Sequence, residues 1–265
     1  MIITLFYANL QLAIWLYCLS TFAVTAADIP SAANHAPVVQ LTVKVIERLP
    51  HDHTAFTQGL EWHQGVLYES TGLYGNSSLR KVDPRTGEVL AKRELDAAYF
   101  GEGLTRVGQQ LIQLTWREGL ALVYDLSDLS LKQAFQYGGE GWGLCFDGES
   151  LWMSNGSSRL YKRNPNNFAV QAQLNVTLNG QPVLKLNDLA CVNGHIYANI
   201  WKESRLVRIN KNNGRIEAEI DASALVAESG QSDPEAVLNG ITYDEQAEVF
   251  YLTGKHWPNM FKVTW

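Results

Sequence analysis

Residues 59–95, GLEWHQGVLYESTGLYGNSSLRKVDPRTGEVLAKREL, contain four short runs in which apolar and polar residues alternate. The runs span residues 59–62, 66–70, 78–83 and 88–95, and the residues between them are rich in Gly, Asn and Pro. Alternation with a period of two, bounded by turn-forming residues, is typical of β-strands joined by tight turns. This stretch is therefore predicted to form a small antiparallel sheet of four strands.

The same unit recurs along the chain, and each copy opens with a small or polar residue followed by Leu or Ile. The spacings between these steps are 44, 40, 45 and 52 residues, and the steps are Gly59-Leu60, Gly103-Leu104, Gly143-Leu144, Asp188-Leu189 and Gly240-Ile241. Four strands per repeat of about 45 residues are typical of a β-propeller blade. We predict an all-β, five-bladed β-propeller over residues 39–265. A two-sheet sandwich matches the strand count but does not explain the recurring register.

The fifth unit supplies only three runs, at residues 241–244, 249–253 and 260–265, before the chain ends. Residues 39–48 (VQLTVKVIER) alternate apolar and polar and precede the first inner strand. We expect this N-terminal strand to complete the last blade. Closing the ring in this way removes the exposed sheet edges that an open array would leave.

Charge divides the N-terminal segment from the rest of the 265-residue chain. The 21 Lys and Arg and 27 Asp and Glu residues give a net charge of −6, and none of them precedes Asp28. An acidic, lightly charged protein lacks the basic surface that neutralises phosphates, which excludes nucleic acid as an expected partner.

Residues 1–27 are apolar and end in Thr25-Ala26-Ala27, a pattern typical of a signal peptide, although the usual basic residues at its start are missing. An uncleaved membrane anchor is the alternative, since the apolar stretch is about long enough to span a bilayer. We expect residues 28–38 to be a linker. We also expect an exported monomer, periplasmic or secreted, with no membrane contact after the signal is cleaved.

Two other sequence features have competing interpretations. Cys145 and Cys191 remain after a signal peptide is removed, and they would allow one disulfide, but both stand in apolar runs, so buried free thiols are expected. His51-Asp52-His53 resembles a pair of metal ligands, but no third ligand follows at a recognisable spacing. A solvated loop is the expectation there.

The repeat register places a set of polar and aromatic residues around one mouth of the propeller. Two residues before each Leu or Ile stand Gln58, Glu102, Trp142, Asn187 and Asn239. Twelve residues after it, where the second strand returns to the same rim, stand Gly72, Trp116, Gly156, Trp201 and Thr253, with Lys255 just beyond. The expected result is a cup with a carboxylate, an ammonium, carboxamides and indoles, which is the usual form of a small-molecule site. The alternative is that the carboxamides satisfy backbone groups and that Trp142 and Trp201 pack between blades.

Long motifs in all five units carry a family resemblance, and they include Phe56-Thr57-Gln58-Gly59-Leu60, Phe100-Gly101-Glu102-Gly103-Leu104, Gly141-Trp142-Gly143-Leu144, Leu186-Asn187-Asp188-Leu189, Leu238-Asn239-Gly240-Ile241 and Thr253-Gly254-Lys255-His256-Trp257-Pro258. From about Val43 to the C-terminus the chain closely resembles the glutaminyl-peptide cyclotransferases of the plant and bacterial type. The resemblance implies conversion of the N-terminal glutamine of peptides and proteins to pyroglutamate, with release of ammonia and without a cofactor or a catalytic metal.

The resemblance also implies roles for individual residues. Glu102 matches the catalytic acid/base, while Lys255, Asn187 and Gln58 match polar residues of the site. Lys255, with Asn187 or Gln58, would polarise the reacting carbonyl. The pocket wall is matched by Phe56, Phe100, Trp116, Trp142 and Trp201. Asp188 departs from the family, which usually has Glu at that position.

Two other functions would use the same cup. A metal-dependent lactone hydrolase on a propeller would place Glu102, Asn155 and Asn187 around a hard cation held by several oxygens. A non-catalytic binding propeller would keep the tryptophans but has little reason to combine Glu102 with Lys255.

Overall fold

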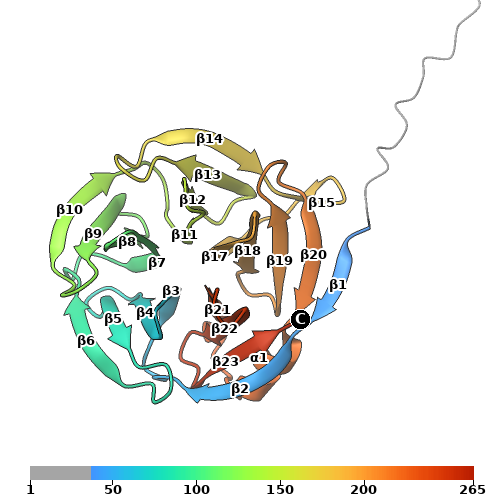
Figure 1. Cartoon of the computed structure of the whole chain (residues 1–265), viewed down its shortest axis with the longest axis horizontal. Coiled ribbons are helices and arrows are strands. Elements are labelled where there is room, and N and C mark those ends of the chain that lie inside the picture. Colours follow the sequence, from blue (N-terminus) through green and yellow to red (C-terminus); the bar gives the residue numbers. More distant parts are fainter. Residues whose placement is uncertain (1–36) are drawn as a thin grey trace, which may run out of the picture. The chain divides into compact units, whose positions relative to one another are not determined.

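The computed structural model describes residues 37–265, in which strands are by far the most common element. Five sheets surround a central axis, as Figure 1 shows. Within each repeat unit the first strand lies innermost, and the following strands of that unit step outward to the rim. The five-bladed β-propeller predicted from the repeat is confirmed.

Blades I to III each consist of four consecutive strands. Blade I contains β3 (Thr57–His63), β4 (Val66–Thr71), β5 (Ser78–Val82) and β6 (Val89–Glu94). Blade II contains β7 (Gly101–Val107), β8 (Gln110–Thr115), β9 (Leu120–Asp125) and β10 (Leu131–Gln136). Blade III contains β11 (Leu144–Phe146), β12 (Leu151–Met153), β13 (Arg159–Arg163) and β14 (Val170–Asn175). The strands of blade I start and end within two residues of the predicted runs.

Blades IV and V also receive strands from the N-terminus. Blade IV contains β17 (Leu186–Val192), β18 (His195–Ile200), β19 (Arg205–Asn210) and β20 (Ile216–Asp221). Blade V contains β21 (Leu238–Asp244), β22 (Val249–Gly254) and β23 (Asn259–Thr264). A small hairpin of β15 (Thr177–Leu178) and β16 (Gln181–Pro182) precedes blade IV, and helix α1 (Ser223–Ser229) joins blades IV and V. Within residues 37–265 no helix combines the length and apolarity needed to cross a membrane.

The ring is closed by β2 (Lys44–Pro50), which pairs antiparallel with β23 as the outer strand of blade V. The expectation of one strand over residues 39–48 is corrected in one respect. β1 (Val39–Thr42) pairs parallel with β20, so it is a fifth strand of blade IV, and the chain crosses between blades at Val43. The Val43 amide donates to the Asp221 carbonyl at 3.0 Å. β1 and β2 are therefore the outermost strands of blades IV and V, so the N-terminal segment joins the last two blades of the ring.

The hydrophobic core is divided among the five interfaces between neighbouring blades. Leu79 of blade I packs with Leu104 and Leu122 of blade II, for example, and Leu206 of blade IV packs with Phe261 of blade V. These side chains are buried, and each cluster joins two sheets face to face. The inner strands thus hold fixed positions around the axis, which is the property a site at their ends requires.

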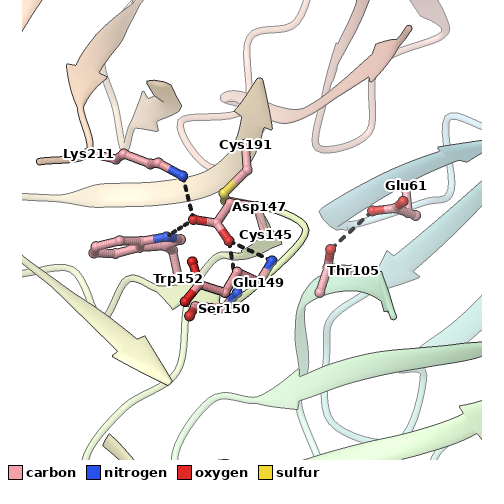
Figure 2. Close-up of a disulfide and its surroundings, with 9 residues drawn as sticks. All are labelled: Glu61, Thr105, Cys145, Asp147, Glu149, Ser150, Trp152, Cys191 and Lys211. Carbon is pink, nitrogen blue, oxygen red and sulfur yellow. Dashed lines mark hydrogen bonds and ion pairs between the residues drawn. A yellow bond between two sulfur atoms is a disulfide. The ribbon is translucent and has the colours of Figure 1, made fainter. Parts of the chain in front are cut away.

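Cys145 on β11 and Cys191 on β17 form a disulfide, so the expectation of free thiols is wrong. Their Cα atoms lie 5.5 Å apart, within the range that a disulfide spans. The bond links the inner strands of blades III and IV and borders a cavity of about 760 Å³ at the end of the propeller opposite to the cup. Figure 2 shows it beside Asp147, which accepts hydrogen bonds from Trp152 and Lys211.

Removing the disulfide is expected to destabilise the protein by as much as about 4 kcal/mol, because the bond closes a loop of 46 residues in the unfolded chain. Denaturant unfolding of Cys145→Ala/Cys191→Ala against the oxidised wild type measures this difference. Reduction should lower the midpoint of the wild type and leave that of the double variant unchanged. Equal midpoints for oxidised and reduced wild type would contradict the expectation.

Candidate active site

A cavity of about 280 Å³ opens at the mouth where the inner strands of the blades begin. Its walls contain the nine residues that the family resemblance assigned to the site: Phe56, Gln58, Phe100, Glu102, Trp116, Trp142, Asn187, Trp201 and Lys255. Asn239, which also stands in the predicted ring, is not among the lining residues. Glu102, Gln58 and Asn187 stand in the first two positions of their inner strands, whereas Lys255 directly follows β22. The register of the repeat is what brings these distant residues together.

Glu102 is the buried carboxyl group of the cup, with 5 % of its surface exposed. The Gln58 side-chain amide donates to Glu102 Oε1 at 3.1 Å. Asn239 in turn donates from Nδ2 to Gln58 Oε1 at 3.1 Å and to the Thr57 carbonyl at 2.9 Å. Asn239 therefore lies behind Gln58 and fixes which way that amide points, so that its NH₂ group faces the carboxyl.

The backbone of Glu102 is held by a second set of polar contacts. Ser70 donates its hydroxyl hydrogen to the Glu102 carbonyl, and Gln113 donates to Ser70 Oγ at 2.7 Å. Gly103 donates from its backbone to the Trp142 carbonyl at 2.6 Å, which links blades II and III at this point. The carboxyl group thus projects from a fixed segment, as a proton-transferring group must.

Electrostatics in the cup act on Glu102 and Lys255 in opposite directions. Burial raises the pKa of Glu102 well above its ordinary value, Lys255 opposes this shift, and Asp188 adds to it. Burial likewise lowers the pKa of Lys255, although Glu102 works against that shift. The Lys255 ammonium lies 4.4 Å from the centre of the Phe56 ring, a cation–π contact. A carboxyl group with a raised pKa can both accept and return a proton near neutrality.

Asn187 contributes an acceptor that the described part of the chain leaves unused. The residue is 3 % exposed, and its Oδ1 has no hydrogen-bond partner within residues 37–265. The next residue, Asp188, has a structural role, since its Oδ2 accepts from the Ile241 amide at 2.9 Å. Asp188 therefore ties the inner strands of blades IV and V together beneath the cup, and burial raises its pKa.

Aromatic rings form the wall of the cup in two groups. Phe100 contacts Phe56 edge-on at 6.1 Å between ring centres and Trp116 at 5.5 Å. Trp142 contacts Trp201 edge-on at 5.7 Å. Glycines make room for these rings: a Cβ on Gly72 would lie 2.3 Å from the Phe100 ring, and one on Gly156 would lie 2.6 Å from the Trp142 ring.

The cup thus combines carboxyl, ammonium, amide and indole groups. The family model for glutamine cyclotransferase matches residues 16–265 of this chain. The chain belongs to the glutamine cyclotransferase family. The protein is 40 % identical over 226 residues to a glutaminyl-peptide cyclotransferase of Arabidopsis thaliana. The matched region covers 83 % of this chain and 70 % of that relative. The crystal structure of Myxococcus xanthus glutaminyl cyclase matches with a TM-score of 0.82 at 38 % identity, covering 86 % of this chain and 98 % of that one.

Asn155, the residue that a lactone hydrolase site would need, is not part of the cup of this cyclotransferase-family protein. Its Oδ1 accepts hydrogen bonds from the Ser157 amide at 3.2 Å and from the Ser157 hydroxyl at 2.6 Å, so the side chain stabilises a turn. Among the described residues, no group of three or more His, Cys, Asp or Glu side chains is placed to hold a metal ion.

Two residues of the cup were missed by sequence reasoning. Leu73 comes one residue after the rim position Gly72, and Glu235 comes from the loop between α1 and β21. Glu235 accepts a hydrogen bond from Lys202 at 2.7 Å, beside Trp201. A loop without periodicity gives no signal for such a contact, whereas Leu73 is adjacent to a position that the repeat register already places at the rim.

His51 lies in a buried network, and the expectation of a solvated loop over residues 51–53 is wrong for this residue. Its side chain is 3 % exposed, with Nδ1 2.7 Å from the Trp257 carbonyl and Nε2 2.9 Å from Glu69 Oε1. Because a carbonyl and a carboxylate only accept, both ring nitrogens donate and the ring is an imidazolium. The network fastens the segment before Phe56 to the loop that follows Lys255.

The His51–Glu69 pair predicts a stability that depends on pH. Burial lowers the pKa of His51, but Glu69 and the Trp257 carbonyl outweigh it, so the folded-state pKa lies above 6.5. The contribution of His51 is then complete below pH 6.5 and is lost as pH rises through the raised value. Burial works against the pKa shift of Glu69, yet His51 and Arg80 lower it below 4.5, so its contribution is lost only as pH falls through that lowered value.

Melting temperatures of the wild type and of His51→Gln, measured across the neutral to alkaline range, test this assignment. We expect the wild type to lose stability as pH rises through the folded-state pKa of His51, and the variant to show a flatter profile. His53→Gln, which changes an exposed ring, is the matched control. A parallel decline in all three proteins would show that His51 does not carry the effect.

Proposed function

We propose that this protein is a glutaminyl-peptide cyclotransferase that converts N-terminal glutamine to pyroglutamate and releases ammonia. The observation that carries the proposal is the buried Glu102 carboxyl in one aromatic cup with Lys255 and Asn187. The names of the Arabidopsis and Myxococcus relatives support the same reaction. Peptides and proteins with glutamine at the N-terminus are the proposed substrates.

Glu102 is the proposed proton shuttle. The α-amine of the substrate has an ordinary pKa of about 7.7–8.0, so part of it is unprotonated near neutrality. As its nitrogen bonds to the γ-carbonyl carbon, the Glu102 carboxylate takes one proton from it. When the carbon–nitrogen bond of the side-chain amide breaks, Glu102 returns that proton to the departing nitrogen, which leaves as ammonia. The carboxylate is thereby restored, and the raised pKa favours both transfers.

Lys255 and Asn187 are proposed to assist at the γ-carbonyl. The Lys255 ammonium would stabilise the negative charge that develops on the carbonyl oxygen during ring closure. Asn187 would donate from Nδ2 to the same oxygen or accept an amine hydrogen at its unused Oδ1. Gln58 keeps the Glu102 carboxyl oriented through the 3.1 Å hydrogen bond.

The aromatic wall is proposed to fold the glutamine side chain back on its own amine and to exclude water. Attack within one molecule gains chiefly from holding the reacting atoms close and aligned. The rings that would do this are Phe56, Phe100, Trp116, Trp142 and Trp201.

The experiment that tests this function is an ammonia-release assay with a Gln-initiated peptide, run with and without a metal chelator. We expect release that the chelator does not reduce, with an acetyl-blocked peptide inert because its amine cannot attack. Release that depends on added metal would contradict the metal-independent reaction. Binding of the peptide without release would favour a non-catalytic propeller.

We further propose that residues 1–27 are a cleaved export signal, that residues 28–38 are a linker and that the mature protein is a periplasmic or secreted monomer. Residues 1–36 lie outside the part of the chain that the structure describes. The Cys145–Cys191 disulfide supports an oxidising compartment. N-terminal sequencing of the protein isolated from its host should begin near Asp28. An intact N-terminus in a membrane fraction would instead identify an anchor.

A further inference from the structure

Two indoles of the cup share one carboxylate that is not itself part of the cup lining. Glu140 lies in the loop between β10 and β11, and its Oε2 accepts from Trp116 Nε1 at 2.9 Å and from Trp142 Nε1 at 3.0 Å. Trp116 follows the last residue of β8, and Trp142 precedes β11. One oxygen of Glu140 therefore joins the ring of a blade II residue to that of a blade III residue.

The other oxygen of Glu140 is held by Arg117. Arg117 Nε donates to Oε1 at 3.0 Å, and the guanidinium carbon lies 3.6 Å from the centre of the Trp116 ring. Partial burial works against ionisation, but the hydrogen bonds from Trp142, Trp116 and Arg117 lower the pKa of Glu140 below its ordinary value. The carboxylate is thus charged at neutral pH and acts as a strong acceptor for both indoles.

The shared carboxylate joins the two groups of rings in the wall. Trp116 contacts Phe100 on one side, and Trp142 contacts Trp201 on the other. The backbones of this region have their own contacts, since the Gly141 amide donates to the Trp116 carbonyl and the Trp142 amide donates to that of Ser154. The two rings are oriented by packing against their aromatic neighbours and by the hydrogen bonds from their Nε1 atoms to Glu140.

We propose that Glu140 is a positioning residue of the cyclotransferase reaction, which locks Trp116 and Trp142 into the wall that shapes the bound glutamine. The inference rests on the proposed function. Without the carboxylate, both indole N–H groups lose their acceptor, and only ring packing still holds Trp116 and Trp142 in place. A displacement of about 1 Å in groups that position a substrate can cost about 10²-fold in rate.

The test compares Glu140→Ala with Glu140→Gln. The Gln variant keeps an oxygen that accepts from both indoles but removes the negative charge of Glu140. That charge also raises the pKa of Glu102 in the wild type. We expect kcat/KM for a Gln-initiated peptide to fall about 10–100-fold in Glu140→Ala, with most of the loss in kcat, and to recover to within about threefold of the wild type in Glu140→Gln. Equal losses in the two variants would show that charge is responsible and would overturn the positioning role.

Two further measurements separate positioning from general destabilisation. Glu94→Ala removes another ion-paired surface carboxylate, on the outer strand β6, and should leave kcat/KM and the tryptophan spectra unchanged. Glu140→Ala should change near-UV circular dichroism at a melting temperature close to that of the wild type. In a Trp116→Phe/Trp142→Phe background, adding Glu140→Ala should have little further effect on kcat/KM; an undiminished loss there would overturn the proposal.

The spectra keep this test separate from the proposed function. If the wild type fails to release ammonia, the proposed function fails, while the change in near-UV circular dichroism still reports whether Glu140 orders the two indoles. An active wild type with unchanged spectra and unchanged kcat/KM in Glu140→Ala would overturn the positioning role alone.

Discussion

Glu102→Gln is expected to lower kcat for ammonia release from a Gln-initiated peptide by about 10²–10⁴-fold, the usual contribution of a positioned acid/base group. The substitution keeps the size of the side chain and an oxygen that can accept from Gln58, so KM should change little. Steady-state kinetics on the folded variant measures the effect. The loss follows because a carboxamide can neither take the amine proton nor return it to the leaving nitrogen.

Glu61→Gln is the matched control for this substitution. Glu61 is also a carboxyl on an inner strand, and burial raises its pKa to about 7, but it accepts from Thr105 at the opposite mouth, as Figure 2 shows. We expect near-normal kcat in Glu61→Gln. Near-normal turnover in Glu102→Gln would refute the assignment of the shuttle.

The pH dependence of turnover should show the raised pKa of Glu102. The carboxylate is the form that accepts the amine proton, so kcat falls as pH drops through that raised value, well above the ordinary 4.5. The residual activity of Glu102→Gln should lack this acid limb. An identical limb in both proteins would assign it to another group.

Lys255→Met is expected to lower kcat/KM by about 10²–10³-fold, the range found when one donor to a developing oxyanion is removed. Methionine retains an apolar chain beside Phe56 but carries no charge. Lys255 is 4 % exposed, and charge stabilisation is stronger in such a site than in water. The deficit should appear mainly in kcat, because the oxygen gains its full charge only as the ring closes.

Lys211→Met provides the comparison for Lys255→Met. Lys211 is a partly buried lysine that donates to Asp147 at 2.9 Å at the opposite mouth, so its loss should leave kcat/KM unchanged. An unchanged rate in Lys255→Met would transfer the oxyanion role to Asn187 or Gln58. Equal losses in both lysine variants would point to a general electrostatic effect.

The parts of the fold that follow from the repeat could be predicted from sequence. The step at Gly59-Leu60 recurs in every unit, and because each blade must present its inner strand to the axis in the same way, positions in register meet at one mouth. That argument placed Glu102, Asn187 and Lys255 in one cup although they are far apart in the chain. Residues outside the periodic strands gave no such signal, and Glu235 was missed for that reason.

The features that sequence could not predict depend on long-range contacts. His51 is buried because the Trp257 carbonyl and Glu69 converge on it. The sequence around His51-Asp52-His53 indicates neither of these distant partners. Cys145 and Cys191 meet because β11 and β17 are neighbours around the axis, although their sequence separation is 46. The division of residues 39–48 into two strands follows from the parallel pairing of β1 with β20, which the alternating pattern does not reveal.

The most direct test of the central claim follows the two nitrogens of the substrate glutamine. A Gln-initiated peptide with an isotopic label in its side-chain nitrogen is incubated with the purified protein, and both products are analysed by mass spectrometry. If the cup catalyses attack of the α-amine on the γ-carbonyl, all of the label leaves as ammonia and the peptide ends in unlabelled pyroglutamate. A peptide that remains unchanged, or one that ends in glutamate because water was the nucleophile, would contradict the account.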